Sequence, residues 1–218
     1  MPSLLLAALL AALAGGLGYA VLSLPQPSVG LADVVAGQMG DSGVSHPVTA
    51  VLLNFRGYDT LLEMAVLLLA LLGVWSLAPH AGAGLRTMPT GPVLAALLRL
   101  VIPVMILVAG YLLWVGGHAP GGAFQAGAVL ASAGVLIGLC GKRIDGRLAT
   151  WPLRVGLVLG VAVFVTVGVA AVLGGAQLLR YPTAWAGGLI LLIEIAATLS
   201  IGVILTALFA GGRPERRR

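Results

Sequence analysis

Charged side chains are scarce in this sequence. Only 9% of its 218 residues are Asp, Glu, Lys or Arg, whereas 60% are hydrophobic. An ordinary soluble domain carries roughly 25% charged residues, so a soluble fold could not hide this much apolar surface. The composition therefore excludes a soluble globular protein and predicts an integral membrane protein.

Groups that hold metals or cofactors are also few. Cys140 is the only cysteine, so it has no partner for a disulfide or a thiolate metal site. The three histidines, His46, His80 and His118, lie far apart and show no metal-ligand spacing such as His-Glu-x-x-His. The sequence also lacks a Ser-His-Asp constellation and a phosphate-binding loop. We therefore expect no cofactor, no metal site and no enzyme acting alone.

Six apolar runs come close to the roughly 20 residues that a helix needs to cross a bilayer. They span residues 4–24, 60–78, 93–115, 122–141, 153–174 and 186–210. We predict an all-α polytopic membrane protein with about six transmembrane helices. The first run could instead be a cleaved signal peptide, but no Lys or Arg precedes it and it is longer than the apolar core of such peptides.

The positions of the basic residues predict how the helices are oriented. With the N-terminus in the cytoplasm, ten of the 12 Lys and Arg residues lie on the inner side, and only Arg56 and Arg180 lie outside. This positive-inside bias predicts a multi-pass protein with both termini in the cytoplasm, and we expect its membrane to be the bacterial cell (inner) membrane. It also explains the net charge of +5, so nucleic acid is not an expected partner.

Two long breaks between apolar runs suggest how the chain is divided. Residues 25–59 form an outer-side loop, in which Val48–Leu53 is too short to span a bilayer and has the β-branched content of a strand or surface hairpin. Residues 79–92 have the Pro, Gly and Ala content of a linker. We expect a two-helix unit over residues 1–78 and a four-helix up-and-down bundle over residues 93–218.

Glycines recur at helix-packing spacing within the expected bundle. Gly134 and Gly138 form one pair, Gly156 and Gly160 form another, and Gly168 follows on the same face. Small residues let helix backbones approach closely in lipid, where no hydrophobic effect drives helices together. Because glycine is also common in membrane helices, each pair is either a packing contact or a chance spacing.

Glu194 is the clearest charged group inside an apolar run, where a charge costs roughly 2.5–3.5 kcal/mol. It lies about eight residues into the last run, roughly 12 Å below its outer end and near the bilayer midplane. Two interpretations remain open. Glu194 is either a carboxylate that exchanges protons or cations, or a carboxyl group that is hydrogen-bonded to a neighbouring subunit.

Glu63 lies one turn inside the second run and also has two possible roles. It follows Thr60 at the spacing of a helix capping box, which is a structural role, or it belongs to an ion path. Asp59 could cap the same helix or pair with Arg56. Arg99, some seven residues into the third run, is expected to snorkel to the inner interface rather than to take part in transport.

The segment Gly116–Gly127 joins the third and fourth runs through a turn rich in Gly and Pro. Its glycines permit positive φ, and Pro120 has no backbone N–H to donate. Such irregular backbone at a membrane boundary is tolerated where it is buried in protein or faces water. His118 could shuttle protons there near neutral pH, and a plain helix–helix turn is the alternative.

One motif in this turn resembles a family signature. The motif comprises Pro120, Gly121, Gly122 and Phe124. It resembles the Pro-Gly-Gly-x-Phe signature of the B subunit of the Mrp (Mnh) multisubunit sodium/proton antiporters. The family often carries its loop histidine where Gly117 stands here, so His118 departs from the pattern by one position.

A second motif runs from Phe55 to Glu63 and includes Arg56 and Asp59. It resembles the two-helix segment at the C-terminal end of the large A subunit of the same antiporters, which is also a separate small subunit of related membrane-bound hydrogenases. Asn54 departs from that segment, which often carries Asp there. The acidic residue of the family motif matches Glu63.

The resemblance implies an accessory membrane subunit of a multisubunit cation (Na⁺)/proton antiporter, with Na⁺ and H⁺ as the transported ions. Other antiporter or respiratory-type membrane subunits would be its partners within the lipid bilayer. Glu63, with Glu194 and His118 as further candidates, would contribute to an ion path. The alternatives are a membrane-arm subunit of a redox-driven, hydrogenase-like complex and a purely structural scaffold.

Overall fold

The computed structural model describes residues 2–24, 30–77, 91–140 and 151–211. Every regular element in this part of the chain is helical, which confirms the all-α prediction. A short 3-10 helix (Met39–Asp41) and a π-helix (Val51–Phe55) accompany the α-helices. The α-helices are α1 (Pro2–Leu22), α2 (Leu31–Gln38), α3 (Pro47–Ala50), α4 (Gly57–Leu77), α5 (Pro92–Val115), α6 (Ala123–Leu139), α7 (Trp151–Leu173) and α8 (Thr183–Ala210).

The six apolar runs all appear as helices. Five of them, α1, α4, α5, α7 and α8, are long and apolar enough to cross a membrane. The sixth, α6, is apolar but has only 17 residues, about 25 Å of helix against a hydrocarbon core of about 30 Å. The prediction of about six membrane helices is confirmed, and the short length of α6 bears on the site below.

The described chain forms two compact units, Met1–Val34 and Val35–Arg218. In the first unit, α1 is apolar throughout and all its described side chains are exposed. The second unit contains α4 to α8. The linker expected at residues 79–92 falls mostly on residues 78–90, which lie outside the described residues, so the division of the chain at that point stays a prediction.

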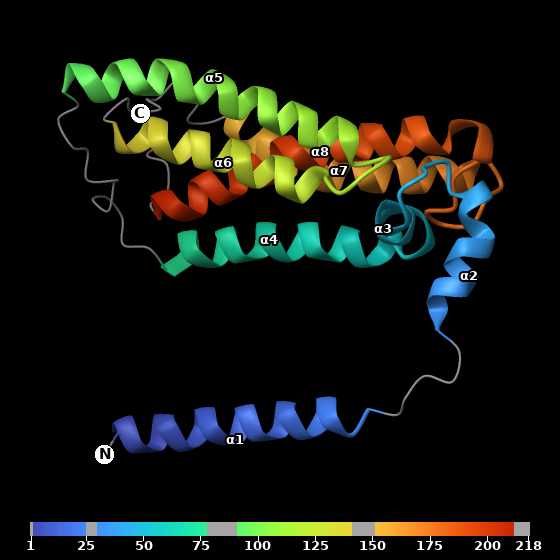
Figure 1. Cartoon of the computed structure of the whole chain (residues 1–218), viewed down its shortest axis with the longest axis horizontal. Helices are drawn as coiled ribbons and strands as arrows, with labels where there is room; N and C mark the ends of the chain where they lie inside the picture. The colour runs from blue at the N-terminus through green and yellow to red at the C-terminus, as the bar shows by residue number, and fades with distance from the viewer. Residues whose placement is uncertain (1, 25–29, 78–90, 141–150, 212–218) are drawn as a thin grey trace. The chain divides into compact units, whose positions relative to one another are not determined.

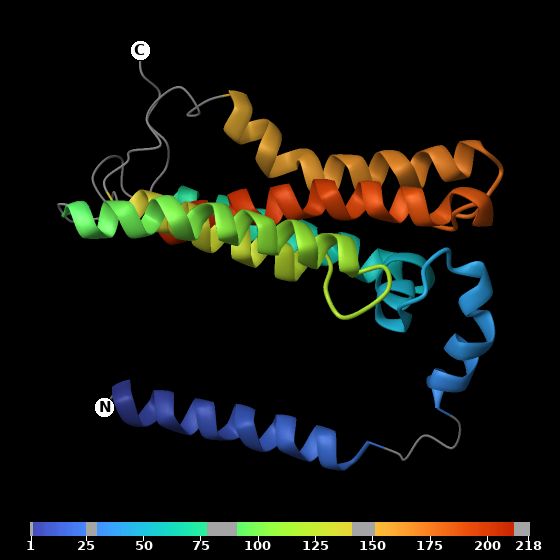
Figure 2. The same cartoon turned by 45° about the horizontal axis from the view of Figure 1, so that its top comes forward.

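Within the second unit, α8 is the central helix. It contacts α4, α5, α6 and α7, and in Figure 2 it lies between α7 and α6. It is the most buried of the candidate membrane spans, while α4, α5 and α7 turn many apolar side chains outward. A group buried in α8 is therefore sheltered from lipid by the neighbouring helices.

The helices of the second unit alternate in direction, as expected for an up-and-down bundle, so α6 and α8 run parallel (Figure 1). Contacts between them give the register. A Cβ atom on Gly122 would lie 2.9 Å from Glu194, and one on Gly134 would lie 2.5 Å from Thr206. Both pairs are separated by the same number of residues, so each residue of α6 lies beside the residue of α8 that follows it by that number.

The glycine pairs differ in what they contact. Gly156 and Gly160 both pack against α8, where Cβ atoms would approach Val203 and Ala197 to 3.3 and 3.2 Å. For this pair the packing alternative is confirmed. Gly168 faces the loop residues Leu178 and Leu179 instead of a helix.

The prediction of a strand or surface hairpin at Val48–Leu53 is wrong. Pro47 begins the helical turn α3, and the π-helix follows it directly. Proline favours the first position of a helix because its fixed φ suits helical geometry and its missing N–H has no partner there in any case. The strand preference of the β-branched residues in this segment depends on context, and it is weaker here than the helical start at Pro47 and the packing of the turn against the bundle.

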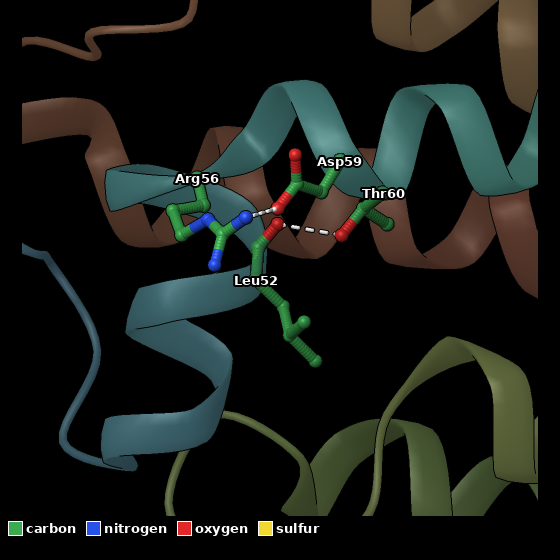
Figure 3. Close-up of polar contacts among 4 residues, drawn as sticks. All are labelled: Leu52, Arg56, Asp59 and Thr60. Atoms are coloured by element: carbon green, nitrogen blue, oxygen red, sulfur yellow. Dashed lines mark hydrogen bonds and ion pairs between the residues drawn. The ribbon is translucent and has the colours of Figure 1, made fainter. Parts of the chain in front are cut away.

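The capping box, one of the two alternatives for Glu63, does not form at Thr60, whose contacts are drawn in Figure 3. Because α4 begins at Gly57, Thr60 already lies inside its first turn, and its hydroxyl donates a 2.6 Å hydrogen bond to the carbonyl of Leu52 in the π-helix. Asp59 forms an ion pair with Arg56, which confirms that alternative. These two contacts hold the π-helix onto the start of α4.

We expect Gly160→Ala to destabilise the second unit. Its Cβ would meet Met64 Cε at 2.5 Å and Ser200 Cβ at 2.9 Å, and overpacking of this kind costs about 1–3 kcal/mol. Gly110→Ala on α5 is the matched control because nothing lies within 4 Å of its Cβ position. Thermal unfolding in detergent should show a lower Tm for the first variant only. Equal Tm values would show that α7 and α8 are not packed as described.

Candidate functional site

The site forms where α6 begins partway along α8. The first residue of α6 follows Gly122, which lies against Glu194, eleven residues after the start of α8. At 1.5 Å per residue this is about 16 Å along α8. The loop between α5 and α6 therefore stands beside the first three turns of α8, where a longer α6 would otherwise pack.

The Pro-Gly-Gly turn makes this arrangement possible. The N–H of Gly122 donates a 2.8 Å hydrogen bond to the carbonyl of Leu112, so the chain folds back along the last turn of α5. Gly122 has φ of 104°, which glycine adopts readily, and a Cβ on Gly121 would clash with that same Leu112 carbonyl. Pro120 is exposed at the tip of the turn.

A preceding segment, Ser42–Phe55, covers this loop. The N–H groups of Ser45 and His46 each donate a 3.0 Å hydrogen bond to the carbonyl of Gly117. The hydroxyl of Thr49 donates another to the carbonyl of Gly116. The Ser42–Phe55 segment thus fixes the α5–α6 turn directly, although the two segments are about 70 residues apart in sequence.

A pocket of about 210 Å³ lies between these segments and α8. Glu194 and His118 both line it, so the fold brings together two candidates that are 76 residues apart in sequence. The other lining residues are Gly43, Val44, Trp114, Gly117, Gly187, Ile190 and Leu191. None of these seven carries an ionisable side chain, so the pocket has one carboxyl and one imidazole group in apolar surroundings.

Glu194 is buried, with 4% of its surface exposed. The first turn of α6 lies against its carboxyl group, since a Cβ atom on Gly122 would be 2.9 Å from Oε1 and Ala123 is the first residue of α6. The N-terminus of a helix carries a partial positive charge and unsatisfied N–H groups, both of which favour a carboxylate. His118, by contrast, has an exposed side chain at the mouth of the pocket.

Glu63 lies elsewhere. Its neighbour Met64 packs against Gly160 and Ala197, so Glu63 is deeper along the bundle than Glu194. Its side chain is nevertheless exposed on the outer surface of α4 and does not line the pocket. An exposed carboxylate at this depth is costly in lipid unless protein or water covers it.

The remaining motif residues support the site from a distance. Phe124 packs against Met64 and Ile201, which anchors the first turn of α6 on α4 and α8. Phe55 is half-buried in the π-helix, and the exposed Arg56 pairs with Asp59. These side chains fix backbone geometry and take no part in the pocket lining.

The sequence analysis missed two buried hydroxyl groups that have no hydrogen-bond partner among the described residues. Thr198 is one turn after Glu194 and is 3% exposed, and its hydroxyl has no hydrogen-bond partner among the described residues. The spacing of four residues from Glu194 was visible in the sequence and could have drawn attention to it. Tyr181 also lacks a partner for its hydroxyl, and burial raises the pKa of this phenol, so it stays neutral.

Within the described ranges, no three His, Cys, Asp or Glu side chains are close enough to hold a metal ion together. Arg99 is exposed in the N-terminal half of α5, and snorkelling remains its expected role. The arrangement favours exchange of a small ion at a single buried carboxyl group.

A family model matches residues 93–210, and it describes a domain related to the MnhB subunit of Na⁺/H⁺ antiporters. A curated relative is the A/B subunit of a probable K⁺/H⁺ antiporter from Rhizobium meliloti (strain 1021), at 28% identity over 178 residues. The alignment covers 67% of this chain and 18% of that protein, so the chain spans less than a fifth of the relative's length.

Two solved structures share the fold. One chain of the membrane-bound sulfane sulfur reductase, an archaeal respiratory membrane complex, matches with a TM-score of 0.73 and 24% identity. That match covers 97% of this chain and 98% of the other. A chain of the Mrp complex from Dietzia sp. DQ12-45-1b matches with a TM-score of 0.70 and 23% identity, over 99% of this chain and 26% of that chain.

We expect Gly122→Ala to disturb the Glu194 carboxyl group. The added methyl group would lie 2.9 Å from Oε1, in addition to the cost of positive φ, roughly 1–2 kcal/mol. Gly175→Ala is the matched control, because Gly175 has φ of 83° and nothing within 4 Å of its Cβ position. The Tm of the purified chain should fall further for Gly122→Ala.

A double variant separates the contact from the backbone strain. In a Glu194→Ala background the carboxyl group is gone, so Gly122→Ala should then cost no more than Gly175→Ala. If the extra loss of stability persists without the carboxyl group, Gly122 and Glu194 are not in contact.

Proposed function

We propose that the chain is an accessory membrane subunit of a multisubunit cation/proton antiporter. The premise is that the chain belongs to the family defined by a domain related to the MnhB subunit of Na⁺/H⁺ antiporters. The pocket that joins Glu194 and His118 is the observation on which this proposal rests. It provides the helix bundle with an ionisable group that is sheltered from lipid, and the exposed His118 lines the same pocket. The similarity to the A/B subunit of a probable K⁺/H⁺ antiporter agrees with this role.

The same proposal places the chain in a bacterial cell membrane with both termini in the cytoplasm. The basic residues supply the support, since ten of 12 would then lie on the inner side. In this orientation α6 and α8 both run from the outer to the inner side. The mouth of the Glu194 pocket, with His118, then faces outward.

Glu63 would act at a border between subunits. A carboxylate exposed on the surface of α4, deeper than Glu194, is stable only if another polypeptide or a water-filled path covers it. We infer that a partner membrane protein of the same complex packs on this face of α4. Glu63 and Glu194 would therefore serve separate segments of an ion path.

A second candidate function has one observation in its favour. The chain of the sulfane sulfur reductase complex matches this one over nearly the full length of both, whereas the Mrp chain is much longer. This chain could therefore be a membrane-arm subunit of a redox-driven complex. Genes for iron-sulfur or nickel subunits beside its own gene would favour that function, and large antiporter-like subunits alone would favour the first.

Transport by the whole complex tests the proposal. In inside-out vesicles that carry the complete gene cluster, we expect Glu194→Gln to lower cation/proton exchange roughly tenfold or more, because an amide cannot exchange protons. Glu63→Gln should also lower exchange. Glu194→Asp, which keeps the carboxyl group, should retain more activity than Glu194→Gln.

Assembly has to be measured in the same vesicles. Co-purification of the partner subunits at the normal ratio shows that the variants assemble. Normal exchange in both Gln variants, with assembly intact, would contradict an ion-path role and leave a structural scaffold.

A further inference from the structure

The chemistry of the Glu194 pocket is poorly suited to a metal cation. Na⁺, K⁺ and divalent cations bind to several oxygen atoms at once. Glu194 is the only lining residue with a side-chain oxygen. Gln125 Oε1 lies 3.8 Å from the Cβ position of Gly122, but its side chain does not line the pocket.

The helix that faces Glu194 also disfavours a bound metal cation. The carboxyl group lies against the first turn of α6, where a Cβ atom on Gly122 would be 2.9 Å from Oε1, so protein backbone already occupies one side of it. The positive end of α6 stabilises the carboxylate and repels a cation at the same point. A carboxylate with this partner needs no metal ion to balance its charge.

The two polar side chains of the pocket are instead both proton carriers. Imidazole and carboxyl groups exchange protons with water, and His118 is the only titratable residue besides Glu194 in the lining. No charged side chain of α6, α7 or the Ser42–Phe55 segment lines it. A volume of about 210 Å³ has room for several water molecules to connect the two groups.

Thr198 provides an independent observation. Hydroxyl groups within helices usually donate to the carbonyl four residues earlier, and Ser132, Thr166 and Thr206 all do so. Thr198 is only 3% exposed and its hydroxyl makes no such bond. Thr198 does not line the pocket, but it follows Glu194 by one turn on the same face of α8, where residues four apart are neighbours.

We propose that Glu194, Thr198 and His118 form a proton-exchange site, and that the metal cation of the transport cycle binds elsewhere. Protonated His118 gives its N–H proton through water to the Glu194 carboxylate, which leaves neutral imidazole and a carboxyl group. The Thr198 hydroxyl then forms a hydrogen bond with that carboxyl group in place of its missing backbone partner. This inference rests on the proposed function and names the ion at this site.

Difference infrared spectroscopy on the purified full chain tests it without a transport assay. Acidification in the absence of Na⁺ and K⁺ should produce the C=O stretch of a buried protonated carboxyl group. Glu194→Gln should remove that band while the helical circular dichroism stays unchanged. Addition of Na⁺ or K⁺ at constant pH should not alter the carboxylate bands of wild type.

A matched pair of variants tests the role of Thr198. Thr198→Val removes the hydroxyl at nearly constant volume and should shift the Glu194 band to higher frequency, because the C=O group loses a hydrogen bond. Thr166→Val is the control, since Thr166 is exposed on α7 and already bonded to Ala162. Thr198→Ser should keep the wild-type band position.

The outcomes are separable. Carboxylate bands that change with Na⁺ or K⁺ in wild type and not in Glu194→Gln would overturn the proposal in favour of a metal cation site, and transport could still depend on Glu194. The absence of a Glu194 band across the accessible pH range would overturn it as well. The third outcome is that wild type shows the C=O band of a protonated Glu194 while Glu194→Gln transports normally. Protons would then exchange at this site, but the site would have no part in antiport.

Discussion

A carboxyl group buried in the central helix of a membrane bundle needs polar partners from its own protein, because lipid supplies none. Glu194 occupies that position on α8. Its partner is the N-terminus of α6. Because α6 has to begin at the level of Glu194, it is shorter than the neighbouring membrane helices. The glycine at position 122 follows from the same requirement, since a Cβ atom there would lie 2.9 Å from the Glu194 carboxyl oxygen.

Irregular backbone then fills the space beside the first three turns of α8. The α5–α6 turn and the Ser42–Phe55 segment occupy it, and hydrogen bonds from Thr49 and His46 hold the two together. Backbone of this kind is tolerated at membrane depth only against protein or water. The pocket and its cover are therefore consequences of one buried carboxyl group, and the two halves of the sequence depend on each other at this point.

The sequence predicted the elements better than the site. Apolar runs set the helix ends to within three residues, because length and hydropathy decide what spans a bilayer. The strand predicted at Val48–Leu53 failed because Pro47 and tertiary contacts decided that segment. The meeting of His118 with Glu194 depends on the parallel register of α6 and α8, which no local pattern contains. Thr198 was overlooked because a lone threonine is unremarkable until its burial is known.

The central claim is that water reaches Glu194 from the outer side through this pocket. Substituted-cysteine labelling tests it most directly, in a Cys140→Ala background with a membrane-impermeant maleimide added outside. Leu191→Cys lies in the pocket lining and should react. Leu192→Cys lies at the same depth but on the face of α8 that is exposed away from the pocket, and it should not react. Reaction at Leu192→Cys alone, or at neither position, would contradict a water-filled pocket above Glu194.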